Sequence, residues 1–108
     1  MDEKRTRAPR ILIVEDDARL VRALRYFLER RGIEVLEAGD GDSGLAAFNE
    51  LLPDLLIIDN SLPNKIGYEV CREVRGGLGK STPIVMVSAF MRVIGADESH
   101  LQELALEN

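Results

Sequence analysis

Short apolar runs alternate with longer segments in which apolar residues recur at helical spacing. The continuous runs at 11–14 (ILIV), 55–58 (LLII) and 83–87 (PIVMV) predict strands, and a run without polar residues is typical of a strand buried on both faces. A further strand is predicted at 33–36, where glutamates favour an edge position. The pattern therefore contains four strands.

The segments between these runs have the period of amphipathic helices. In the first helix, Asp16 or Asp17 caps the N-terminus and Gly32 ends the helix. Its apolar face is formed by five residues: Leu20, Val21, Leu24, Phe27 and Leu28. A second helix runs from Leu45 to Leu52, before Pro53, and a third from Ile66 to about Arg75, before a cluster of glycines. From Met91 onward the pattern is again helical but polar.

Strands that alternate with helices predict an α/β fold with a parallel sheet and helices on both of its faces. The chain has 108 residues, which is the size of one domain. Residues 1–9 are basic and are predicted to form a flexible tail, and residues 10–108 are predicted to form the folded unit.

Composition narrows the class of function. The net charge of −5 and the absence of Trp argue against direct binding of nucleic acid. No apolar run approaches the roughly 18 residues of a membrane span, and no signal peptide is recognisable. The single cysteine, Cys71, has no internal disulfide partner, and its helical neighbours favour a packing role. These features favour a cytoplasmic protein.

Polar residues follow the predicted strands at the points where the strands end. Glu15, Asp16 and Asp17 follow the first run, Asp59 follows the run at 55–58, and Ser88 and Ala89 follow the run at 83–87. Ligands of an open parallel sheet bind beyond the carboxyl ends of its strands, so these residues are candidates for one site. A helix cap or a turn remains the alternative explanation for each acidic residue taken singly.

Carboxylates that cluster at one rim repel one another unless a cation is present. Oxygen ligands without Cys or His suit Mg²⁺ or Mn²⁺ better than Zn²⁺. A metal ion there leaves one carboxylate to attack phosphorus as a nucleophile, and Ser88 can donate a hydrogen bond to a phosphoryl oxygen.

Two other features carry less weight. The segment GGLGKS at 76–81 ends like a phosphate-binding loop, but it lacks the leading glycine and precedes a strand where such loops precede a helix. His100, the one histidine, lies in a polar segment and is best explained as a solvated residue.

The motifs ILIVEDD, LLIIDNSLP and TPIVMVSA together resemble the receiver domain of two-component response regulators, over about residues 10–90. The resemblance implies a flavodoxin-like, doubly wound sheet with strand order 2-1-3-4 before the usual fifth strand. It also implies a signalling domain, limited as a catalyst to Mg²⁺-dependent self-phosphorylation and autodephosphorylation.

The same resemblance assigns roles to individual residues. Asp59 is implied as the phosphoacceptor, with a sensor histidine kinase or phosphotransfer protein as donor. Asp16 is the main acidic Mg²⁺ ligand, assisted by Asp17 or Glu15, together with Asp59 and the backbone carbonyl of Ser61. The remaining implied positions are the switch residues Ser88 and Ala89 and the loop residues Pro63 and Gly67.

Two departures from the family pattern stand out. Asn64 replaces the first glycine of the usual Pro-Gly-x-x-Gly loop, and asparagine tolerates a left-handed backbone. More seriously, no lysine follows Lys80, so the phosphate-binding lysine and the fifth strand of receivers have no counterpart in the pattern. The strand at 83–87 then becomes a sheet edge, which invites covering by residues 91–108, pairing with another chain, or domain swapping.

Two alternatives to a working phosphoacceptor remain. The missing lysine favours a degenerate receiver that acts as a phosphorylation-independent interaction module. A phosphatase of the haloacid dehalogenase type requires a second aspartate two residues after the nucleophile, where this chain has Ser61.

Overall fold

Four parallel strands form the sheet at the centre of the protein. The computed structural model describes residues 7–87. Its strands are β1 (Arg10–Val14), β2 (Glu34–Ala38), β3 (Leu55–Asp59) and β4 (Ile84–Val87), and its helices are α1 (Ala18–Glu29), α2 (Gly41–Leu51) and α3 (Gly67–Gly76). The strand order is β2-β1-β3-β4, and every neighbouring pair is parallel. The predicted α/β class and strand order are therefore confirmed.

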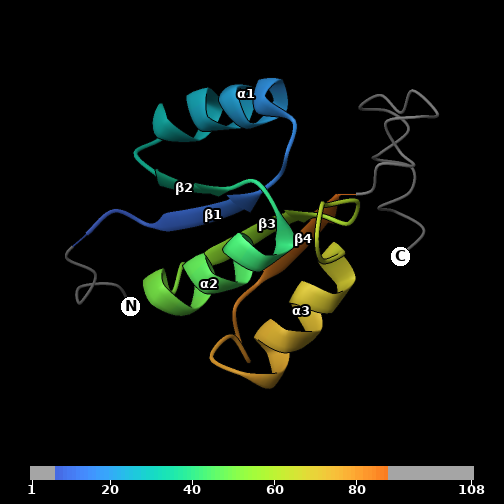
Figure 1. Cartoon of the computed structure of the whole chain (residues 1–108). Coiled ribbons are helices and arrows are strands. Elements are labelled where there is room, and N and C mark those ends of the chain that lie inside the picture. The colour runs from blue at the N-terminus through green and yellow to red at the C-terminus, as the bar shows by residue number, and fades with distance from the viewer. Residues whose placement is uncertain (1–6, 88–108) are drawn as a thin grey trace, which may run out of the picture.

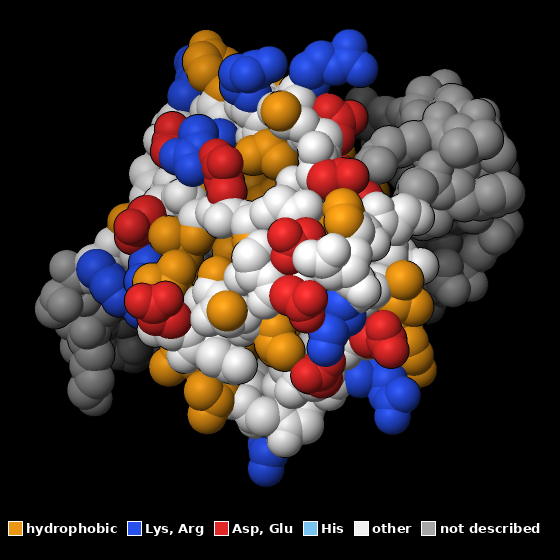
Figure 2. Space-filling view, in the orientation of Figure 1, with side chains coloured by type: hydrophobic (Ala, Val, Ile, Leu, Met, Phe, Trp, Pro, Cys, Tyr) orange, Lys and Arg blue, Asp and Glu red, His pale blue; other side chains and the backbone are white. Residues whose placement is uncertain are grey.

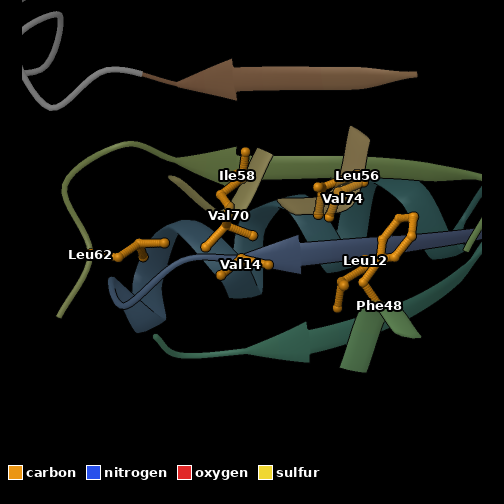
Figure 3. Packing of buried hydrophobic residues seen from close by; sticks show 8 residues of the cluster. All are labelled: Leu12, Val14, Phe48, Leu56, Ile58, Leu62, Val70 and Val74. Atoms are coloured by element: carbon orange, nitrogen blue, oxygen red, sulfur yellow. The ribbon is translucent and has the colours of Figure 1, made fainter. Parts of the chain in front are cut away.

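Helices cover both faces of this sheet, with α1 on one face and α2 and α3 on the other (Figure 1). The larger core lies under α2 and α3 and contains Leu12, Val14, Phe48, Leu56, Ile58, Leu62, Val70 and Val74 (Figure 3). The smaller core, under α1, is built on Ile13, Val21 and Val35. Because β1 contributes to both cores, its last three residues are fully buried, as a continuous apolar run predicts.

The helix ends agree with the predicted signals at α1 but not at α2. Asp17 caps α1, and Gly32 follows its end with a left-handed φ of 79°. Helix α2 begins at Gly41, four residues before the predicted start at Leu45, because the Asp40 side chain accepts the Ser43 backbone N–H. The first turn of α2 contains no large apolar residue, so periodicity alone does not reveal it.

Phe27 was expected on the apolar face of α1, and this expectation is wrong. Its side chain is 51% exposed, and the Arg31 guanidinium carbon lies 3.7 Å from the centre of the ring. Tyr26 and Arg30 form a similar stack at 5.3 Å. Cation–π contact allows these rings to stay at the surface. Lys and Arg side chains gather along the α1 side of the molecule, at the top of Figure 2.

Within residues 7–87, the two strands at the edges of the sheet differ in polarity. Strand β2 carries Glu34 and Glu37, as expected of an edge, whereas β4 has the sequence IVMV. Val85 and Met86 in β4 are 49% and 42% exposed. The polar segment from Met91 lies outside the described residues. Among the residues that are described, no helix is both long and apolar enough to span a bilayer.

Candidate functional site

Asp59 ends β3 at the carboxyl edge of the sheet, and its side chain is buried, with 1% exposure. One of its carboxylate oxygens, Oδ1, accepts the backbone N–H of Ser61 at 3.2 Å. Strand β1 pairs with β3 in a parallel register that sets Val14 beside Ile58. The residue after Val14 therefore lies next to Asp59 across the two strand ends.

Glu15 and Asp16 supply the carboxylates that face Asp59. Glu15 is 6% exposed, its backbone N–H donates to the Ala38 carbonyl, and its Oε2 accepts the Asp17 N–H at 3.0 Å. One carboxylate oxygen from each of Glu15, Asp16 and Asp59 lies within 4.8 Å of the other two. The expected convergence of acidic side chains at this rim is present in the structure.

Asp17 has a different local role from its two neighbours. Its Oδ1 accepts the backbone N–H groups of Arg19 and Leu20 at the start of α1, at 3.0 and 3.4 Å. It is not among the carboxylates grouped around Asp59 in the described part of the chain. Of the two assistants left open by the sequence, Glu15 is therefore the one whose position suits a ligand shared with Asp16.

The loop after Asp59 packs tightly against the end of β3. Gly67, the first residue of α3, lies against backbone atoms of Asp59 and Asn60, and an added Cβ there would fall 2.8 Å from the Asn60 Cα. Asn64 has a φ of 74°, a left-handed backbone conformation that asparagine tolerates. Pro63 lies in the same loop, and its carbonyl accepts the Gly41 N–H at 3.3 Å.

Lys65 ties this loop to both helices on its face of the sheet. Its Nζ lies 2.5 Å from Glu73 Oε2 and 4.0 Å from Asp42 Oδ1. The hydrogen bond to Glu73 raises the pKa of the Lys65 ammonium group above its usual range, and desolvation opposes this effect. Sequence reasoning missed this cluster because its members come from a loop and two helices without a shared period.

A groove of about 570 Å³ opens beside the acidic cluster, between α1 and the end of β2. Glu15 and Asp16 line one end, and Arg22, Arg25 and Glu37 line the rest with smaller residues. The hydrogen bond to Glu37 raises the pKa of Arg25, and Glu29 contributes in the same direction. Arg25, in the wall of this groove, is therefore paired with Glu37 and Glu29.

The chemistry of these donors suits a small, hard cation. The carboxylate oxygens of Glu15, Asp16 and Asp59 can each provide one ligand, and the Ser61 backbone lies next to Asp59. Oxygen donors of this kind fit Mg²⁺, which normally completes its shell with water and phosphate oxygens. Asp59 and Val87 are in register between β3 and β4, but Ser88 and Ala89, the predicted switch residues, lie outside the described residues.

Comparison with known proteins gives the family. Residues 11–100 match the family described as "Response regulator receiver domain". The chain belongs to this family. Receiver domains of response regulators are signalling domains of bacterial two-component systems, rather than enzymes in the usual sense.

Similar proteins include longer regulators. The receiver chain is 42% identical over 84 residues to the transcriptional regulatory protein ResD of Bacillus subtilis, covering 78% of this chain and 34% of ResD. It is 43% identical over 84 residues to the DNA-binding response regulator MtrA of Mycobacterium bovis, covering 78% of this chain and 36% of MtrA. The chain thus spans about a third of the length of these relatives.

Solved structures agree with this assignment. A response regulator from Chloroflexus aurantiacus has a TM-score of 0.71 and 38% identity, over 74% of this chain and 66% of that one. The chemotaxis response regulator CheY4 of Vibrio cholerae has a TM-score of 0.70 and 31% identity, over 73% of this chain and 67% of that one. The receiver fold is shared with both.

Proposed function

We propose that this receiver domain accepts a phosphoryl group on Asp59 in a two-component phosphorelay. The observation that carries the proposal is the convergence of Glu15, Asp16 and Asp59 at the carboxyl ends of β1 and β3. A buried aspartate beside two further carboxylates has the surroundings of a metal-assisted nucleophile. The donor in the proposal is the phosphohistidine of a sensor histidine kinase or of a phosphotransfer protein.

The phosphoryl transfer in this proposal is a displacement at phosphorus. A carboxylate oxygen of Asp59 forms the new P–O bond while the P–N bond of the phosphohistidine breaks, and the leaving imidazole nitrogen keeps the electron pair and takes up a proton. The Ser61 N–H holds the Asp59 carboxylate in orientation through its bond to Oδ1. When bound, Mg²⁺ or Mn²⁺ neutralises charge on the carboxylates and on the phosphoryl oxygens.

The residues that hold the metal in this proposal are Glu15, Asp16, Asp59 and the backbone carbonyl of Ser61. Asp17 acts instead as the cap of α1, because its Oδ1 already accepts two backbone N–H groups. Ser88 and Ala89 stay predicted as the residues that meet the phosphoryl group. A change of conformation after phosphorylation also belongs to the proposal, since added charge at this rim alters its hydrogen bonds.

The extent and location of the domain are proposed on the same basis. Residues 10–108 form the receiver unit, after a basic tail at 1–9, and the unit acts in the cytoplasm. The chain spans only about a third of the length of ResD and MtrA, so no downstream partner is part of the proposal.

The experiment is labelling by a small phosphodonor. The chain is incubated with acetyl phosphate and Mg²⁺, and its intact mass is compared with that of Asp59→Asn. We expect a phosphate-sized increase in mass for the unmodified chain and none for Asp59→Asn or in the presence of EDTA. Asp42→Asn, which removes a 65% exposed carboxylate from α2, is the matched control and should label normally.

A chain that stays unlabelled under conditions that label an ordinary receiver would contradict the proposal. That outcome would favour the second candidate, a receiver that binds its partner without phosphorylation.

A further inference from the structure

The loop at 60–66 joins β3 to α3 and contains the Ser61 carbonyl, one of the metal ligands in the proposed function. Backbone hydrogen bonds fix both ends of this loop. The Asn60 N–H donates to the Val87 carbonyl at 2.9 Å, and the Gly67 N–H donates to the Asn60 carbonyl at 3.0 Å. The direction of the Ser61 carbonyl therefore depends on how the middle of the loop is held.

The middle of this loop rests on the start of α2 and on the core. The Pro63 carbonyl accepts the Gly41 N–H at 3.3 Å and the Lys65 N–H at 2.8 Å. The Lys65 carbonyl lies so close to Gly41 that no side chain fits between them. Leu62 is buried in the larger core (Figure 3). Lys65 is the one charged residue of the loop, so any ionic contact of the loop is made by its side chain.

The ammonium group of Lys65 connects the loop to two helices. Its Nζ lies 2.5 Å from Glu73 Oε2 on α3 and 4.0 Å from Asp42 Oδ1 on α2. Helices α2 and α3 cover the same face of the sheet (Figure 1), so one side chain joins both of them to the loop. The Lys65 side chain is only 26% exposed, which shields these pairs in part from solvent. The loop is therefore held at Lys65 by charge as well as by packing.

We propose that Lys65 is a positioning residue for the metal site. Its pairs with Glu73 and Asp42 hold the loop against α2 and α3, and this fixes the direction of the Ser61 carbonyl earlier in the same loop. The inference rests on the proposed function, in which that carbonyl is a ligand of Mg²⁺. Lys65 itself is not a ligand, because an ammonium group has only hydrogen-bond donors and no lone pair.

Loss of the Lys65 charge and loss of its positioning have opposite effects on Mg²⁺ binding. The chain has a net charge of −5, and a chain with one positive charge fewer attracts a cation more strongly. A loop that is free to shift presents the Ser61 carbonyl in several directions, and a ligand without a fixed orientation binds a metal more weakly. The sign of the change in affinity therefore separates the two explanations.

Isothermal titration with Mg²⁺ at fixed ionic strength measures this sign. We expect Lys65→Met to weaken Mg²⁺ binding about two- to fivefold, the range set by a partly exposed ion pair. Lys65→Arg keeps a cation beside Glu73 and should remove less than half of that effect. Lys80→Met is the matched control, since it removes the same charge from an exposed residue before β4, at the opposite edge of the sheet from Asp59. Its affinity for Mg²⁺ should equal or slightly exceed that of the unmodified chain.

Two further measurements make the test independent of one substitution. Glu73→Gln removes the partner on α3, and a double variant with Lys65→Met should bind Mg²⁺ no more weakly than Lys65→Met alone, because both changes break the same pair. In the metal-free chain, Lys65→Met should speed amide hydrogen exchange at Gly41, whose N–H bonds to Pro63 in the loop. Urea unfolding should change little, since surface ion pairs contribute little to global stability.

Four results would overturn the proposal. The first is Mg²⁺ binding by Lys65→Met that is as tight as that of the unmodified chain or tighter, as charge alone predicts. The second is an equal loss of affinity in Lys80→Met. The third is a double variant in which the effects of Lys65→Met and Glu73→Gln add. The fourth is unchanged hydrogen exchange at Gly41 in Lys65→Met.

Failure of this inference is distinguishable from failure of the proposed function. The proposed function is judged on the unmodified chain, by its binding of Mg²⁺ and by the labelling of Asp59. The inference is judged on the difference between each variant and the unmodified chain. Its hydrogen-exchange measurement requires neither a bound metal ion nor a phosphoryl group.

Discussion

The Asn60 side chain accepts a hydrogen bond from the backbone N–H of Tyr68, with 3.0 Å between Oδ1 and N. Asn60 directly follows Asp59, and Tyr68 is in the first turn of α3, so this bond joins the end of β3 to a helix N-terminus. A backbone bond from Gly67 N–H to the Asn60 carbonyl, also at 3.0 Å, supports the same junction. No residue at the start of α3 provides a side-chain cap, and Asn60 serves this purpose from eight residues away.

Replacing Asn60 by alanine should destabilise the protein by about 1 kcal/mol, the usual effect of losing a helix-capping side chain. Urea unfolding followed by circular dichroism measures the change. Asn49→Ala, at an exposed position of α2, is the control and should cause no loss, because alanine is a good helix former. An Asn60→Ala protein as stable as the unmodified chain would show that the bond to Tyr68 is dispensable.

Gly67→Ala adds only one methyl group, but it should lower the stability of the protein clearly. The added Cβ would meet the carbonyl oxygen of Asp59 and the Asn60 Cα, and both are backbone atoms that cannot move aside cheaply. We expect a loss of about 1–3 kcal/mol in stability, typical of overpacking, and reduced labelling of Asp59 by acetyl phosphate. Urea unfolding and intact mass give the two readouts.

Gly76→Ala is the matched control for this change. Gly76 ends the same helix, and an added Cβ there meets nothing within 4 Å. Alanine replaces glycine in a helix with a gain of roughly 0.5–1 kcal/mol in favourable cases, so this variant should be no less stable than the unmodified chain. Equal losses for the two variants would mean that close packing at Gly67 is unimportant.

The sequence was sufficient to predict the architecture of the sheet and the convergence of Asp16 and Asp59 at one rim. Strand β3 is recognisable because LLII is apolar without interruption, and the parallel order brings the residues after β1 and β3 to one rim. The placement of Asp59 and Asp16 at this rim could therefore be predicted from the sequence. Gly32 was equally informative, since a glycine after an amphipathic stretch is a common helix end.

Other features depend on geometry that the pattern does not encode. Asp16 and Asp17 are adjacent, and only the backbone at Asp17, with φ of −86° and ψ of 104°, decides that its carboxylate turns to the N–H groups of α1. The bond from Tyr68 to Asn60 crosses a loop and has no period to reveal it. Phe27 has helical spacing, but a guanidinium covers its ring at the surface.

Asp40 should make stability depend on acidic pH. The backbone N–H of Ser43 and then its hydroxyl donate to the Asp40 carboxylate, and these bonds hold the pKa of Asp40 below its usual range. A lowered folded pKa stabilises the protein above the unfolded value of about 3.9, and this contribution is lost as the pH falls through the folded pKa. Asp40→Asn keeps a capping oxygen but does not ionise.

The test compares urea unfolding of the two proteins between pH 7 and the lowest pH at which both unfold reversibly. We expect Asp40→Asn to be the less stable at pH 7 and the difference to shrink as the pH falls below about 4. Glu50→Gln, which removes an exposed carboxylate from the same helix, serves as the control. A difference that stays constant over this range would exclude a role for the ionised form of Asp40.

Binding of Mg²⁺ should distinguish Glu15 from Asp17, the two candidates that the sequence left open as assistants to Asp16. Isothermal titration at fixed ionic strength measures the affinity. We expect Asp16→Asn and Glu15→Gln each to weaken binding by at least about tenfold, because each removes a charged oxygen ligand from the cluster around Asp59.

Asp17→Asn is the informative counterpart, since asparagine is as good a helix cap as aspartate and the variant preserves the start of α1. Its affinity should stay within about twofold of the unmodified chain, because its carboxylate faces the N–H groups of Arg19 and Leu20. A loss at Asp17 as large as that at Asp16, with normal binding by Glu15→Gln, would reverse the assignment. Each of the three substitutions removes one negative charge. A purely electrostatic effect would therefore weaken Mg²⁺ binding equally in all three variants, whereas direct ligation weakens it only where a ligand is lost.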